Sequence, residues 1–274
     1  SGKTESVLWP QVLQDVLDGK GCVVISGKGS DEEVATIKGI AQVAGREANL
    51  RVFALPAWNQ PALPSHTYNM VWVEPCTPET GGGDPVAVAE RVFSVLPLGD
   101  NRYYNTQAQI MFTNLCRLLH GMMDARGFGQ PFTMRDLAVC LKGVGNKNPA
   151  WRGALDHCLA RSRDQEAARE VVSQIDRLGH EIHKALSGLV GAVDKFQAPL
   201  VNAYAPDIVM RDVLERNLIV YVQLPSNLFK IQAPSLGKVF LMDVQQEGSL
   251  RQVFRTTRSQ RPFSVVVDEF GRFA

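Results

Sequence analysis

Apolar residues lie in short continuous runs near both ends of the chain and recur at helical spacing in its middle. The runs are rich in Val, Ile, Leu and Phe and are bounded by Gly, Pro or charged residues, which predicts strands. We expect these strands at residues 21–26, 50–55, 217–224 and 263–267. Runs that lack polar alternation are typical of parallel strands covered on both faces.

Helical spacing dominates from about Tyr104 to Phe196. A first wide apolar stripe contains Ile110, Met111, Phe112, Leu115, Leu118, Leu119 and Met122. Thr133 to Asp136 resembles an N-terminal capping sequence for a short helix that stops at Gly143. A second stripe steps by three and four residues, which predicts one long helix packed in a bundle. It contains Ala168, Val171, Ile175, Leu178, Ile182, Ala185 and Leu189.

Helices are also expected between the strands. One begins at Asp31-Glu32-Glu33 and ends near Gly45, and another covers residues 235–246. Together the elements predict an α/β fold with a mostly parallel sheet and an inserted all-α domain. The expected division is an α/β domain at 1–99 and 200–274 with the all-α insert at 100–199. At 274 residues and 45% apolar composition, the chain is large enough to bury a core.

The first four residues resemble the second half of a phosphate-binding loop. In the pattern G-x-x-x-x-G-K-[ST], backbone amides and the lysine bind phosphates and the hydroxyl binds Mg²⁺. Gly2, Lys3 and Thr4 match its end, and helix-like residues follow at once. We therefore interpret the chain as a fragment, with the first glycine and its strand upstream. With half of the loop missing, we expect the chain by itself to be inactive and monomeric.

The last predicted strand ends in two acids. Val265, Val266 and Val267 form a β-branched run that leads into Asp268 and Glu269. In P-loop enzymes the first such acid holds Mg²⁺ and the next can orient the attacking water. A strand-ending pair on a solvated loop is the ordinary alternative. Combined with Gly2-Lys3-Thr4, the pair favours an ATPase that uses ATP and Mg²⁺.

Net charge and cysteine content exclude few functional classes. The formal net charge of +1 indicates no global attraction to nucleic acid or membrane. The five cysteines are scattered singly, without a C-x-x-C pair that would suggest zinc or redox chemistry. No apolar run approaches the roughly 18 to 20 residues that span a bilayer, and no signal peptide is visible.

Three further features keep two interpretations each. Lys28, between two glycines, either senses phosphate or shapes a tight strand-to-helix turn. His180 and His183 stand three residues apart, close enough to share a metal on a helix, but without a third ligand they favour a polar helix edge. A basic segment either forms one helix face suited to phosphates or is a solvated helix end or mobile loop. It contains Arg251, Arg255, Arg258 and Arg261.

Six segments, in order along nearly the whole chain, resemble one known family. They are SGKTE (1–5), ISGKGSD (25–31), SHTYN (65–69), LSGLV (186–190), IVYVQLP (219–225) and VVDEF (266–270). On these motifs the chain resembles the coupling proteins of conjugation and type IV secretion, the TraD/TraG-like branch of hexameric P-loop motor ATPases. It departs from them at Ser26-Gly27, where the family usually has Asp-Pro, which leaves the role of the Lys28 turn open.

The resemblance implies a RecA-like P-loop domain carrying an all-α domain, assembled as a homo-hexamer on the cytoplasmic side of the bacterial inner membrane. Such proteins use ATP to move DNA, or protein–DNA substrates delivered by a relaxosome, into the type IV secretion channel. Carried over by residue, Gly2 and Lys3 bind the phosphates, Thr4 and Asp268 serve Mg²⁺, and Glu269 orients or deprotonates the water. A sensor glutamine and a trans-acting arginine would lie beyond Ala274.

Three functional hypotheses follow. The first is an ATP-driven coupling motor for conjugative or type IV secretion transfer. The second is another hexameric DNA-pumping ATPase, which would lack a docking surface for a relaxosome or adaptor. The third is a nonenzymatic receptor module, in which a degenerate nucleotide-binding fold carries a helical domain that recognises secreted substrates.

Overall fold

The computed structural model groups the chain into two compact units, residues 1–68 with 206–274 and residues 69–205. It describes residues 4–55, 65–77, 82–145, 148–254, 262–269 and 271. Of residues 4, 5, 253 and 254, only the backbone is described. Because both chain ends belong to the first unit, the second unit is a single continuous excursion from it.

The first unit is an α/β fold around a parallel sheet, as the sequence predicts. Its four strands follow the order β2-β3-β1-β4, and every neighbouring pair is parallel. The strands are β1 (Gly21–Ser26), β2 (Leu50–Ala54), β3 (Ile219–Gln223) and β4 (Phe263–Asp268). The helices are η1 (Thr4–Leu8), α1 (Trp9–Leu17), α2 (Asp31–Val43), η2 (Glu47–Asn49), α9 (Met210–Glu215) and α10 (Gln232–Phe254). This arrangement is consistent with a Rossmann-like or RecA-like core.

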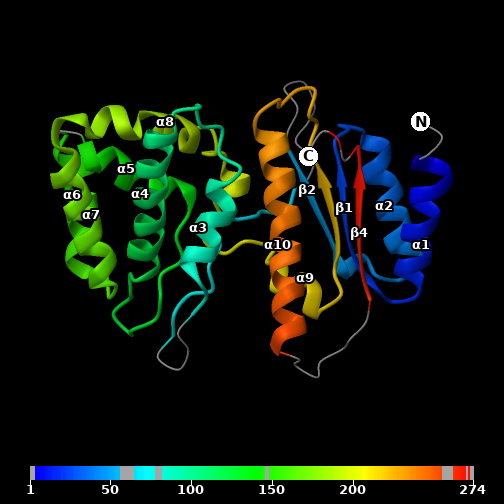
Figure 1. The fold of residues 1–274 in the computed structure, drawn as a ribbon. Coiled ribbons are helices and arrows are strands. Elements are labelled where there is room, and N and C mark those ends of the chain that lie inside the picture. Colours follow the sequence, from blue (N-terminus) through cyan, green and yellow to red (C-terminus); the bar gives the residue numbers. More distant parts are fainter. Residues whose placement is uncertain are drawn as a thin grey trace. The chain divides into compact units, whose positions relative to one another are not determined.

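Helices cover both faces of this sheet, with α1 and α2 on one face and α9 and α10 on the other (Figure 1). On the first face, alternate residues such as Val24 and Tyr221 pack against Val12 and Ile37 of the helices. On the second face, three rings form the centre of the core: Phe53, Tyr68 and Phe240. The rings of Tyr68 and Phe240 are stacked with centroids 4.2 Å apart.

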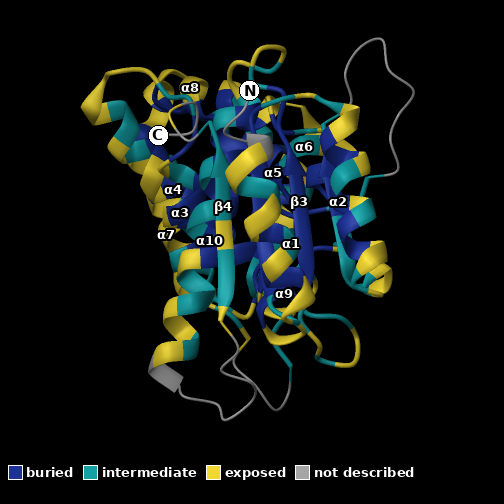
Figure 2. Cartoon of the chain, turned by 90° about the vertical axis from the view of Figure 1, so that its right-hand side faces the viewer, coloured by how far each residue is buried: buried dark blue, intermediate teal, exposed yellow. Residues whose placement is uncertain are grey.

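Burial falls from the inner strands to β4. Every residue of β1 and β3 is buried, whereas β4 is only half-buried and Val265 remains 44% exposed (Figure 2). In the described part of the chain, β4 pairs only with β1 and stands at an edge of the sheet. The Val265–Val267 run therefore lies in the predicted strand but is less covered than its composition suggests.

The second unit is helical in the residues that the structure describes. Its elements are α3 (Pro85–Phe93), α4 (Arg102–His120), α5 (Met134–Gly145), α6 (Pro149–Arg161), α7 (Gln165–Leu178), η3 (Gly179–Glu181), α8 (Ile182–Asp194) and η4 (Pro199–Val201). Side-chain caps begin α3, α4, α6 and α7; for example, Asn101 accepts a bond from Tyr104 N and Asp164 accepts one from Ala167 N. Such caps fix where a helix starts.

The prediction of one long helix through Ala168 and Leu189 is wrong. The segment is broken at Gly179, which has a φ of +48° and starts a single 3₁₀ turn between α7 and α8. A positive φ is accessible to glycine and ends an α-helix. The apolar spacing continues across the break because both helices pack against α4.

The unit boundaries differ from the expected division at 99/100 and 199/200. Residues 69–99 group with the helices, and Phe93 of α3 packs on Phe112 of α4 with ring centroids 5.9 Å apart. The two segments of the first unit that lead into and out of the second unit are hydrogen-bonded to each other. Thr67 N and Oγ donate to Asp207 Oδ2 at 2.8 and 2.7 Å. Tyr68 and Ile208 also form an isolated parallel bridge.

The longest described helix is α10, with 23 residues. Neither it nor any other helix in the described ranges combines the length and apolar character needed to cross a membrane. The buried face of α10 is part of the core of the first unit. There Phe240 is fully buried, and Asp243 accepts a 2.7 Å hydrogen bond from the Tyr68 hydroxyl. Burying this polar pair is tolerable because each group satisfies the other.

At the amino end of the strands, Asp15 ties α1 to β4. Its carboxylate accepts bonds from Ser264 Oγ at 2.5 Å and from Lys20 Nζ at 2.8 Å. Burial is the largest single influence on the pKa of Asp15 and acts to raise it, but the bonds from Lys20 and Ser264 together outweigh burial. The pKa of Asp15 is therefore lowered, and the charged form is stabilised by folding.

We predict that Asp15→Asn lowers the free energy of unfolding by about 1 to 2 kcal/mol at neutral pH. Because the folded pKa is depressed, this stabilisation is present above the unfolded value of about 4 and is lost as the pH falls through the folded value. Urea unfolding of both proteins at several pH values measures it. A difference that is unchanged between neutral and strongly acidic pH would contradict the role of the carboxylate charge.

Candidate functional site

The strands end in one row at the carboxyl edge of the sheet. Ser26 of β1 is paired in register with Gln223 of β3 on one side and with Asp268 of β4 on the other. The Gln223 side chain donates to the Ser30 carbonyl at 3.1 Å and so joins β3 to the start of α2. In open parallel sheets this edge is where ligands bind, which makes it the place to look for chemistry.

Lys28 lies in the turn after β1 and forms an ion pair with Asp268. Its Nζ is 2.6 Å from Asp268 Oδ2, and its backbone N–H donates to Ser26 Oγ at 3.2 Å. Desolvation is the largest influence on the pKa of Lys28 and acts to lower it. The bond and charge of Asp268, with the charges of Glu33 and Glu269, outweigh desolvation and raise the pKa. Lys28 is therefore held in its charged form.

Glu33 of α2 is a second carboxylate beside Lys28. Its side chain is buried, and Oε2 accepts bonds from Ser26 Oγ at 2.6 Å and from Tyr221 OH at 2.8 Å. Its other oxygen, Oε1, lies 3.6 Å from Lys28 Nζ. A buried carboxylate is costly unless it is paired and hydrogen-bonded, and Glu33 meets both conditions.

Tyr221 has a hydroxyl between the apolar residues Val220 and Val222 of β3. Burial is the main reason that the pKa of this phenol is raised, and the neighbouring Glu33 charge raises it further. The hydroxyl therefore keeps its proton and donates it to Glu33 Oε2. Ser26, Glu33, Tyr221, Lys28 and Asp268 thus form one connected network, which we call the edge network.

Glu269 is the residue directly after Asp268 of the edge network. Its φ of +58° puts it in the left-handed region, which a non-glycine residue adopts only when its surroundings hold it there. The side chain is half-buried, and its charge contributes to the raised pKa of Lys28. The two acids predicted from the sequence, Asp268 and Glu269, therefore both lie at the carboxyl edge, close to a cation.

The structure describes only part of the predicted phosphate-binding loop. Gly2 and Lys3 lie outside the described residues, and Thr4 is described by its backbone, which starts the π-helical turn η1. That turn leads into α1, whose first end lies at the same end of the sheet as the strand tips (Figure 1). The ring of Trp9, the first residue of α1, is 6.3 Å from that of Tyr221. The helix after Gly2-Lys3-Thr4 therefore starts at the predicted edge.

The residues predicted to hold magnesium, Thr4 and Asp268, would hold it together with a bound nucleotide and not as a site made of protein alone. Among the described residues no cluster of three or more His, Cys, Asp or Glu side chains is suited to a metal ion. Magnesium is commonly bound by one or two carboxylates plus substrate phosphates. Asp268 suits this role because it already binds a cation, the ammonium group of Lys28. Thr4 is the other predicted ligand.

Of the remaining sequence candidates, the structure describes His180, His183 and Arg251. His180 lies in the 3₁₀ turn and His183 in α8, and in the described ranges neither belongs to a group of three or more His, Cys, Asp or Glu side chains that could hold a metal ion. Arg251 is on α10, where its guanidinium donates to the Leu214 carbonyl at 3.1 Å. The other three arginines of the basic segment, at 255, 258 and 261, lie outside the described residues.

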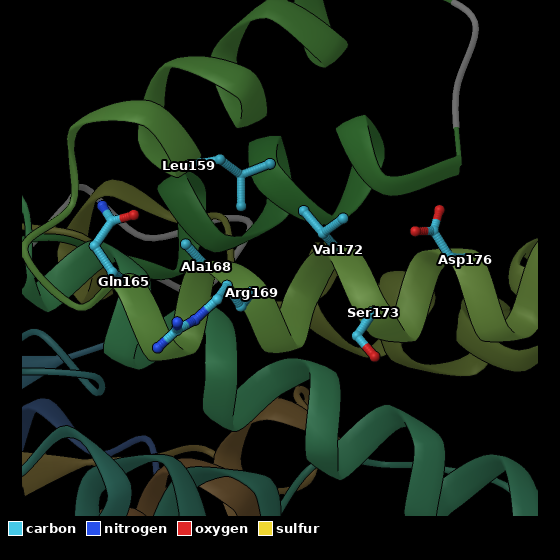
Figure 3. A pocket seen from close by; sticks show the side chains of 7 residues that line it. All are labelled: Leu159, Gln165, Ala168, Arg169, Val172, Ser173 and Asp176. Atoms are coloured by element: carbon cyan, nitrogen blue, oxygen red, sulfur yellow. The ribbon is translucent and has the colours of Figure 1, made fainter.

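The helical unit carries an open groove of about 520 Å³ between α6 and α7. Leu159 and Val172 contribute its apolar surface, and Val172 is 41% exposed (Figure 3). The polar side chains of Gln165, Arg169 and Asp176 lie along α7 at its margin. This combination of an apolar floor with charged margins is suited to binding another molecule.

The sequence did not reveal the edge network as a network. It singled out Lys28 and Asp268 separately, and it did not single out Ser26, Glu33 or Tyr221 as site residues. Two signals were present: a tyrosine within an apolar strand, and an acid on the inward side of the first turn of α2. Both become meaningful only when β1 is known to lie between β3 and β4.

Comparison with known proteins provides no family. No protein-family model matches this chain, and no curated protein sequence matches it.

We predict that Tyr221→Phe lowers the free energy of unfolding by about 1 to 3 kcal/mol, because Glu33 loses a donor that water cannot replace. Tyr103→Phe removes the same hydroxyl from a side chain that is 54% exposed, and it serves as the matched control with a near-zero effect. Urea unfolding compares both variants with the parent. Equal effects of the two substitutions would contradict a buried hydrogen bond to Glu33.

Proposed function

We propose that this chain is part of a P-loop ATPase of the coupling-protein type, which moves DNA or a protein–DNA substrate into a conjugative or type IV secretion channel. One observation carries the ATPase proposal: Asp268 and Glu269 stand at the carboxyl edge of a parallel sheet, where Asp268 forms an ion pair with Lys28. The helix that follows Gly2-Lys3-Thr4 starts at this same edge.

Each predicted residue has a role in this proposal. The backbone of Gly2 and the ammonium of Lys3 bind the phosphates, and Thr4 and Asp268 hold Mg²⁺. Bound Mg²⁺·ATP supplies the phosphoryl group and the positive charge that offsets its developing negative charge. Glu269 orients the attacking water or accepts its proton.

The coupling role is supported by the motif resemblance and by the division into an α/β unit and a helical unit. In this proposal the first unit is a RecA-like domain and residues 69–205 form the inserted all-α domain. The full-length protein is a homo-hexamer anchored on the cytoplasmic side of the inner membrane. DNA, the relaxosome or secretion substrates and the secretion channel are its partners.

A receptor without ATPase activity is the second candidate. The groove between α6 and α7 favours it, because a surface with an apolar floor and charged margins suits a protein ligand. In that case the edge network is only structural, and turnover is absent from the full-length protein.

The first experiment measures ATP hydrolysis by the full-length protein with no DNA, with single-stranded DNA and with double-stranded DNA. We expect turnover that DNA stimulates, and a decrease of about 10²- to 10⁴-fold in Glu269→Gln because the group that orients water is lost. Lys3→Ala should abolish turnover by weakening phosphate binding. Glu32→Gln is the matched control, because Glu32 is an exposed acid on the first turn of α2.

Turnover that survives both Lys3→Ala and Glu269→Gln would show that these residues are not the site. No turnover under any condition would favour the receptor candidate. Turnover that is insensitive to DNA would leave the ATPase proposal intact and overturn the DNA-moving role.

A further inference from the structure

Lys28 forms an ion pair with Asp268, the residue whose carboxylate the proposed function assigns to Mg²⁺. Its Nζ is 2.6 Å from Asp268 Oδ2, a short charge-assisted contact between residues 240 positions apart. The side chain of Lys28 is 27% exposed and that of Asp268 is 17% exposed, so water screens the pair only in part. Any other cation that binds Asp268 must contend with this ammonium group.

A second carboxylate is already in place for Lys28. Glu33 Oε1 lies 3.6 Å from the ammonium, and Glu33 is fixed through its other oxygen by Ser26 and Tyr221. Lys28 therefore stands between a carboxylate that is anchored and one that ends an edge strand. A small rotation of its flexible side chain exchanges one partner for the other.

We propose that Lys28 is a positioning residue that competes with Mg²⁺ for Asp268 and transfers its ammonium group to Glu33 when the divalent cation is bound. This inference rests on the proposed function. Without nucleotide, the lysine neutralises Asp268 and keeps its carboxylate directed along the carboxyl edge. With Mg²⁺ present, repulsion between two nearby cations disfavours the Lys28–Asp268 pair, and Glu33 receives the ammonium.

The test is the Mg²⁺ requirement for nucleotide binding by the full-length protein. A fluorescent, non-hydrolysable ATP analogue is held at constant concentration while Mg²⁺ is titrated, and anisotropy gives the half-saturating Mg²⁺ concentration. We expect Lys28→Met to lower this concentration by about tenfold, because the competing charge is gone. Lys28→Arg keeps the charge and should stay close to the parent.

The sign of the change separates this role from structural damage. A lysine that only supports the fold, or that binds phosphate directly, would raise the Mg²⁺ requirement when it is removed. Lys38→Met is the matched control, because Lys38 is an exposed lysine on α2, and it should leave the requirement unchanged. Thermal unfolding of each variant confirms that it is folded.

Glu33→Gln tests the receiving carboxylate. Without that charge Lys28 remains on Asp268, so the Mg²⁺ requirement should increase in the parent background. In the Lys28→Met background the same substitution should have little effect, because no ammonium remains to be received. Equal effects in the two backgrounds would show that Glu33 acts on the cation directly and would overturn the transfer step.

The outcomes distinguish this inference from the proposed function. If the parent binds no nucleotide at any Mg²⁺ concentration, both fall. If the parent binds nucleotide and Lys28→Met leaves the requirement unchanged or raises it, only the competition is overturned. If Lys28→Met does not fold, Lys28→Gln carries the same expectation, since it also removes the charge and keeps a polar side chain.

Discussion

The hydrogen-bond register of the parallel sheet is the constraint on which the carboxyl edge depends. β1 pairs with β3 and β4 at once, so Ser26, Gln223 and Asp268 finish in the same row. A slip of one residue in β4 would turn the Asp268 side chain to the opposite face of the sheet, because side chains alternate. Lys28 would then lose its nearest carboxylate, and the neighbourhood of the two acids would change.

Charge in the edge network is compensated locally. Glu33 is almost completely removed from water, and two hydroxyl donors with one ammonium group offset the cost of desolvating it. Such a network is worth little in net stability while it is complete, and it is costly when one member is lost. The network therefore links β1, α2 and β3 through Ser26, Glu33 and Tyr221. The ion pair of Lys28 with Asp268 links it to the end of β4.

Local patterns predicted the four strands and the helices α1, α2, α4, α5 and α10, because β-branched runs and apolar spacing are properties of neighbouring residues. Helices α3, α6 and α9 were not predicted individually. The helix through Ala168 and Leu189 was wrong because its spacing continues through Gly179, where only the backbone conformation records the break. The acids at 268 and 269 could be assigned to a strand end. The pairing of Asp268 with Lys28 could not be predicted, since strand order brings together residues that the sequence separates. The phosphate-binding roles of Gly2 and Lys3 remain predictions, because both residues lie outside those that the structure describes.

The clasp formed by Thr67 and Asp207, with the bridge between Tyr68 and Ile208, has a consequence for how this architecture can change over time. Both ends of the helical excursion are fastened together inside the α/β unit. The entropic cost of closing a loop grows only slowly with its length, so the sheet is almost indifferent to how many residues the excursion contains. Descendants could enlarge, shorten or exchange the helical unit, and with it the molecules it meets, while the carboxyl edge stays as it is.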